Sequence, residues 1–130
     1  EELPVDLREM STYRLGKTCE KLGRNDAARE FYLEVFYDNA ERLKQDGNEA
    51  HWFYFARSGF DAARLILQMA RERDNGTDGD DDAYVSAAKI YDRLIKSGIP
   101  TAAEAQKRLE ALRAEQEVET EATDAPEPPK

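Results

Sequence analysis

The spacing of apolar residues constrains this chain most, because it is helical from Leu7 to about Ala114. Apolar residues recur three and four positions apart, which places them on one side of an α-helix. No pair of segments shows the alternation expected of two neighbouring strands. We therefore predict an all-α fold, with helices over residues 7–22, 25–46, 49–73, 83–96 and 101–114.

Helix-breaking residues separate these segments. Gly23 follows the first, Asp46-Gly47-Asn48 the second and Ser97-Gly98-Ile99-Pro100 the fourth. Thr101 and Glu104 have the spacing of a capping box that begins the fifth. From residue 115 the chain holds too few apolar residues to order itself. We thus predict one helical domain over residues 1–114 and an acidic disordered tail over 115–130.

The net charge of −9 is concentrated in two segments. Residues 74–82 hold five acids and no base, residues 115–130 hold six acids and one base, and the remainder carries +1. The acidic total disfavours nucleic acid and anionic membrane surfaces as partners. No run approaches the roughly 20 apolar residues that span a bilayer. Because the chain begins at Glu1 rather than Met, we expect a processed or trimmed chain.

No motif for catalysis is present. The chain lacks G-x-S-x-G, a phosphate-binding glycine loop and H-E-x-x-H, so we expect neither an enzyme nor a cofactor. Cys19 lies on the apolar stripe of the first helix, where a buried thiol is expected. The lone His51 has no second His or Cys at metal-ligand spacing, so packing or capping is its expected role.

The aspartate-rich loop of residues 74–82 offers one alternative function. Against the calcium pattern D-x-[DN]-x-[DN]-G-x5-E, Asp74, Asp78 and Gly79 match. Gly76 stands at the third place, and Val85 stands where a bidentate Glu belongs. A solvated acidic loop is the expectation, and a calcium-responsive helical module is the alternative.

Two segments share a longer pattern. The first contains Leu15-Gly16, with Cys19 three residues later, and then Ala28-x3-Tyr32. The second contains Trp52-x2-Phe55-Ala56 and then Ala87-x3-Tyr91, with Pro100 beyond it. Both resemble the tetratricopeptide repeat (TPR), W-x2-L-G-x2-Y…A-x3-F…P, although Thr12 and Ala40 replace the Trp and the Pro of the first repeat.

The resemblance implies antiparallel helical hairpins stacked as a short right-handed superhelix. Repeat 1 would cover residues 9–46, an atypical repeat 2 residues 49–99, and a capping helix residues 101–114. Repeat 2 is atypical because its two small residues, Ala56 and Ala87, are 31 positions apart, whereas Gly16 and Ala28 are 12 apart. Two repeats are few for independent stability, which favours a dimer or a larger assembly.

The resemblance also implies a function in protein–protein interaction, as an adaptor, scaffold or assembly subunit. The first helix of each hairpin would line a groove for a peptide or partner helix, with candidate binding residues Tyr13, Lys17, Glu20, Lys21, Phe53, Arg57 and Phe60. Tyr13 and Lys17 lie four positions apart, as do Phe53 and Arg57, so each ring shares a helix face with a cation. Such pairs suit a peptide with an apolar side chain and a carboxylate. The alternatives are that the rings are core and the cations solvated, or that the chain is a purely structural subunit.

Overall fold

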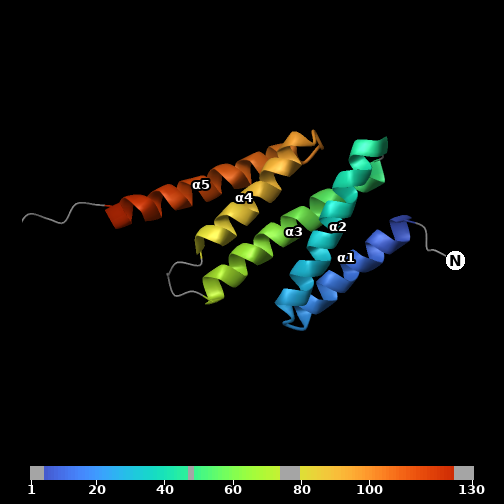
Figure 1. Ribbon diagram of the computed structural model, residues 1–130, viewed down its shortest axis with the longest axis horizontal. Coiled ribbons are helices and arrows are strands. Elements are labelled where there is room, and N and C mark those ends of the chain that lie inside the picture. Colours follow the sequence, from blue (N-terminus) through green and yellow to red (C-terminus); the bar gives the residue numbers. More distant parts are fainter. Residues whose placement is uncertain (1–4, 47–48, 74–79, 125–130) are drawn as a thin grey trace, which may run out of the picture.

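The structure is a computed structural model that describes residues 5–46, 49–73 and 80–124. Five helices follow one another along the chain (Figure 1): α1 (Val5–Lys21), α2 (Asn25–Asp46), α3 (Glu49–Arg73), α4 (Asp80–Lys96) and α5 (Ala102–Asp124). The described residues contain no strand, so the prediction of an all-α fold is confirmed. None of the described helices is long and apolar enough to cross a membrane.

Each helix packs against the next one in the chain. The contacts of α2 with α1 and α3, and those of α4 with α3 and α5, account for most of the packing, and α1 also meets α3. The helices therefore form a row, with α1 and α5 at its two ends (Figure 1). Because α3 lies next to α2 and α4 and also meets α1, its faces are largely covered.

Two glycines end helices where the sequence predicted it. Gly23 has a φ of +76°, its N–H bonds to the Glu20 carbonyl, and the Arg24 N–H bonds to the Cys19 carbonyl at 2.8 Å. This pair of bonds is the Schellman motif, whose left-handed residue favours glycine. Gly98, at φ +68°, follows α4 in the same conformation and donates to the Ile95 carbonyl.

Three predicted boundary features are wrong. Helix α4 begins at Asp80 rather than Ala83, and α5 continues to Asp124 instead of ending near Ala114. Residues 115–124 include four Glu, one Gln and one Ala, which favour helix even where little apolar surface is buried. The predicted disordered tail is thus helical to Asp124, and residues 125–130 lie outside the described part. The capping box does not form, because the buried Thr101 Oγ1 has no hydrogen-bond partner.

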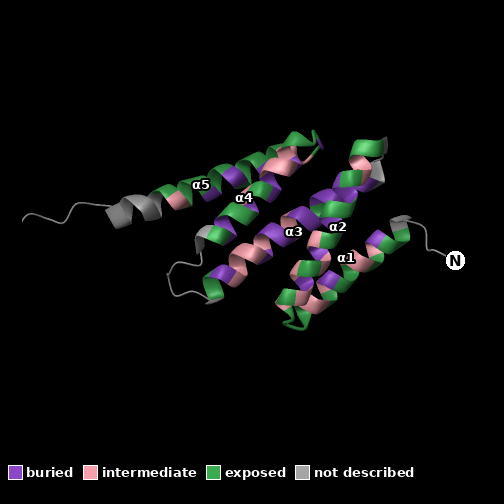
Figure 2. Cartoon of the chain, in the orientation of Figure 1, coloured by how far each residue is buried: buried purple, intermediate pink, exposed green. Residues whose placement is uncertain are grey.

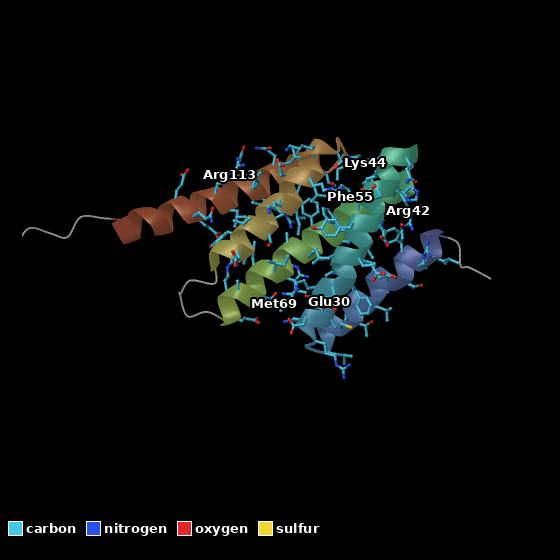
Figure 3. All side chains as sticks on the ribbon, in the orientation of Figure 1. Glu30, Arg42, Lys44, Phe55, Met69 and Arg113 are labelled. Atoms are coloured by element: carbon cyan, nitrogen blue, oxygen red, sulfur yellow. The ribbon has the colours of Figure 1, made fainter. Side chains whose placement is uncertain are left out.

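The core centres on the aromatic residues of α2 and α3. Phe55 of α3 (labelled in Figure 3) is 1% exposed. It stacks on Phe36 of α2, with ring centroids 4.7 Å apart and planes inclined by 7°. Glycine permits the close approach: a Cβ added at Gly59 would lie 2.9 Å from the Phe36 ring, and one at Gly16 would lie 2.6 Å from the ring of Tyr32. Every helix contributes buried residues, which alternate with exposed ones along the helix (Figure 2).

The apolar stripe predicted for the first helix is only partly buried. Cys19 packs partly buried against the core, but Leu7, Leu15 and Leu22 are 43%, 50% and 67% exposed. Their side of α1 faces away from α2. Periodicity correctly identified the stripe, but no other described helix covers it.

Candidate functional site

A polar network joins α1 to α3 on the face where the groove was predicted. Asp61 of α3 accepts a hydrogen bond from the Tyr13 hydroxyl and lies 3.2 Å from the Lys17 Nζ. Lys17 also lies over the Tyr13 ring, 5.6 Å from its centroid. The expected pairing of Tyr13 with Lys17 is present, but both groups are held by Asp61.

The network continues to α2 through a second carboxylate. Glu20 accepts hydrogen bonds from the Tyr32 hydroxyl at 2.9 Å and from Arg64 at 2.8 Å. Arg64 also reaches Asp61 at 3.3 Å, so it links the two acids. The network therefore ties together three helices.

The environment moves the pKa values of this network away from neutrality. The hydrogen bond from Arg64 lowers the pKa of Glu20. Burial raises the pKa of Tyr13 and of Tyr32, and their hydrogen bonds to carboxylates raise both further. A general acid or base works best with a pKa near the operating pH. Because the pKa values of Glu20, Tyr13 and Tyr32 all move away from neutral pH, they favour a structural role for the network.

We predict that Glu20→Gln destabilises the fold in a pH-dependent manner. Because the pKa of Glu20 is lowered from 4.5 on folding, its carboxylate contributes stability that is complete above that value and lost as pH falls through the folded value. Urea unfolding should show the variant less stable than the parent at about pH 7, with the gap narrowing at acidic pH, below the ordinary value of 4.5. The control Glu30→Gln, an exposed carboxylate on α2 (Figure 3), should match the parent at both values. An unchanged gap for Glu20→Gln would contradict the assignment.

A pocket of about 490 Å³ lies beside the network, between α3 and the beginning of α5. Its lining combines three aromatic rings, three guanidinium groups, one carboxylate and two small residues: Trp52, Phe53, Phe60, Arg57, Arg64, Arg108, Asp61, Ala56 and Thr101. The face carrying the network and the pocket is therefore built from α1, α3 and α5.

Two of the pocket's arginines stack on its rings. The Arg57 guanidinium lies 5.3 Å from the Phe53 centroid, and that of Arg108 lies 4.5 Å from the Phe60 centroid. Arg108 also bonds to Glu104 through Nε at 3.0 Å. Since a guanidinium has five N–H donors, both arginines keep donors for an incoming carboxylate.

The electrostatics of the pocket favour an anion. Its single carboxylate, Asp61, is already engaged by Tyr13, Lys17 and Arg64. Arg57 and Arg108 line the same pocket as Ala56 and Phe60, and Arg108 lies over the Phe60 ring. The arrangement suits a ligand that inserts an apolar side chain and presents a carboxylate to a guanidinium.

The predicted binding residues divide into three groups. Phe53, Arg57 and Phe60 line the pocket, whereas Tyr13 and Lys17 belong to the network. Lys21 is exposed in the last turn of α1 and lines neither.

Sequence reasoning missed Asp61, Arg64, Thr101 and Arg108. Asp61 and Arg64 lie four and seven residues after Arg57, so helical spacing could have placed them on its face. Thr101 and Arg108 carried no such signal, because their positions depend on how the turn after α4 directs α5.

The remaining candidates lie elsewhere. His51 is buried, with its Nδ1 3.9 Å from a carboxylate oxygen of Glu9. The calcium-loop residues Asp74, Asp78 and Gly79 lie outside the described residues, and Val85 is exposed on α4. Within the described ranges, no group of three or more His, Cys, Asp or Glu residues is placed to hold a metal ion.

Comparison of the chain with protein-family models, with curated proteins and with solved structures gives no match.

Proposed function

We propose that this chain is a protein–protein interaction module with a TPR-like stack of hairpins, which binds a partner segment in the pocket between α3 and α5. The observation that carries the proposal is the lining of that pocket, in which Arg57 and Arg108 lie over the aromatic rings of Phe53 and Phe60. The bound segment would contain one large apolar side chain with a carboxylate nearby, from Asp, Glu or the chain terminus.

The helix pairing supports a repeat arrangement. Leu15-Gly16 of α1 and Phe55-Ala56 of α3 are related by a shift of 40 residues, and each lies on the first helix of an antiparallel pair. The extra residues of the second pair lengthen α3 to 25 residues, against 17 in α1. In this arrangement α1, α3 and α5 are the helices that share the network and pocket face.

The pocket chemistry favours binding over catalysis. Arg57 and Arg108 donate hydrogen bonds but do not exchange protons near neutrality. The neighbouring Glu20 and Tyr13 have pKa values shifted away from the range useful for proton transfer. Aromatic and arginine side chains are also the types enriched at the centres of protein interfaces.

A peptide selection tests this function. The parent chain is screened against a random peptide library displayed with free C-termini, and selected peptides are measured by the fluorescence of Trp52, the single tryptophan, which lines the pocket. We expect the selected peptides to share a large apolar residue within a few positions of an acid or of the terminus. Amide capping or Asp-to-Asn replacement in the peptide should weaken binding at least about tenfold.

Charge-reversal variants separate the pocket from general electrostatics. Arg57→Glu and Arg108→Glu should each reduce peptide affinity at least about tenfold. The matched control is Arg113→Glu, an exposed arginine further along α5 that does not line the pocket (Figure 3). Equal losses in all three variants, or selected peptides without an acid, would refute the proposed site.

A further inference from the structure

The outer face of α1 is apolar and exposed. Leu7 and Leu15 lie on one stripe of α1, which Leu22 extends directly after the last helical residue, and the three are 43%, 50% and 67% exposed. Ser11 and Thr18, which are also exposed, lie between them on the same stripe. We call this set the α1 face. It points away from the pocket, because Tyr13, Lys17 and Glu20 occupy the side of α1 that meets α3.

The corresponding face of α3 is covered by a helix. Shifted by 40 residues, Leu15, Thr18 and Leu22 correspond to Phe55, Ser58 and Ala62, which are 1%, 0% and 0% exposed. Helix α2 lies on this side of α3, where its Phe36 stacks on Phe55. The packing of α2 on α3 is therefore an example, within this chain, of a helix covering a face that corresponds to the α1 face.

The charges around the α1 face identify the kind of helix that would fit. Every exposed charged residue described in α1 is basic, namely Arg8, Arg14 and Lys21. Helix α2, which covers the corresponding face of α3, carries six acidic and three basic residues. A second copy of the chain would instead bring the basic flanks of two α1 helices together, which is unfavourable.

Helix α5, at the other end of the row of helices, has a polar outer face. Between Ala102 and Glu117, α5 buries Ala105, Leu109 and Leu112 against the body, and its exposed residues are charged, polar or alanine. A polar outer face is typical of a terminal helix that needs no neighbour. The α1 face is instead apolar with basic flanks, which is typical of a helix that packs against a neighbour.

Three observations agree: α2 covers the corresponding face of α3, the exposed charges of α1 are basic, and only α5 has a polar outer face. We propose that the α1 face is a second docking surface, which binds an acidic amphipathic helix of a partner protein. Leu15 and Leu22 would take up its apolar side, and Arg14 and Lys21 would pair with its acidic flanks. This surface is separate from the pocket and does not depend on the function proposed for it.

The test uses a fluorescein-labelled peptide with the sequence of α2, residues 25–46. This peptide carries the acidic residues of α2 and also Phe36, which packs on the corresponding face of α3. Anisotropy titration should show saturable binding to the intact parent chain, weakening as salt is added. Leu15→Glu/Leu22→Glu and Arg14→Glu/Lys21→Glu should each weaken it at least about tenfold. The replaced residues are exposed, and circular dichroism confirms that the variants fold. A probe peptide carrying Phe36→Asp should lose affinity to the same extent.

Two matched controls make the outcome decisive. Val85→Glu changes an exposed apolar residue of α4, and Arg57→Glu/Arg108→Glu changes the pocket; neither should weaken probe binding as much as the α1-face variants do. No saturable binding to the parent, or equal loss in either control, overturns the proposal. If light scattering shows a parent dimer that becomes monomeric in Leu15→Glu/Leu22→Glu, the occupant is a second copy and the proposal is also overturned.

Discussion

Replacing Phe55 with alanine is expected to lower the free energy of unfolding by about 3–5 kcal/mol, a large part of the roughly 5–15 kcal/mol typical of a domain. Phe55 is 1% exposed and stacks on Phe36 at the junction of α2 and α3. Truncation removes a buried ring and leaves a cavity that the surrounding helices fill only in part. Urea unfolding followed by circular dichroism gives the free energy, with an unchanged slope showing that the variant still unfolds as one unit.

The control for this prediction lies two residues earlier in the same helix. Phe53 is 43% exposed at the pocket, so Phe53→Ala removes a ring of the same size from a half-solvated position. We expect it to cost less than about 1.5 kcal/mol, because little buried area is lost. Similar losses for the two variants would contradict the placement of Phe55 at the centre of the core.

The second large effect is expected at a buried ion pair between α1 and α2. Glu9 is 4% exposed and pairs with Arg42, while the His51 Nδ1 lies 3.9 Å from its other oxygen. Arg42→Met should cost about 3–5 kcal/mol, because it leaves a buried carboxylate without its cation. Urea unfolding near neutral pH measures this loss.

A double variant separates the charge effect from loss of packing. Glu9→Leu/Arg42→Met removes both charges and keeps apolar volume, and such replacements are often neutral or stabilising. We expect it to recover most of the stability lost in Arg42→Met. A double variant as unstable as the single one would show that Arg42 acts through its aliphatic stem rather than through its charge.

Helix positions could be predicted because they follow from local chemistry. The three-and-four spacing and the glycines at positions 23 and 98 fix the ends of α1 and α4 almost to the residue. The end of α5 lies beyond its predicted position because a low apolar content does not prevent helix formation. Helix propensity continues through residues 115–124 until Pro126.

Features that depend on neighbouring helices were harder to predict. Periodicity shows that Leu15 and Leu22 form a stripe, but only the packing shows that α2 covers α3 on that side and leaves α1 open. Likewise, Phe53 and Arg57 could be found from their spacing. Arg108 could not, because it reaches the pocket only through the direction in which α5 leaves α4.

The pocket and the network differ in whether their cationic side chains keep hydrogen-bond donors available for a ligand. In the network, Asp61 contacts Arg64 and also Lys17, a cation predicted for ligand binding. In the pocket, Arg57 and Arg108 lie over aromatic rings and retain free donors. The face predicted as a groove between α1 and α3 is therefore occupied by a hydrogen-bonded network, and we expect binding at the pocket between α3 and α5 instead.

The most direct test of this account is a two-dimensional ¹H–¹⁵N NMR titration of the parent chain with the tightest peptide from the selection. Chemical-shift changes should concentrate at residues 52–64 of α3 and 101–108 of α5, which carry the pocket lining. The indole N–H of Trp52 should be among the most affected signals. Changes confined to the ends of α2 and α4, where a smaller pocket of about 310 Å³ is lined by Lys44 and Lys96, would contradict it.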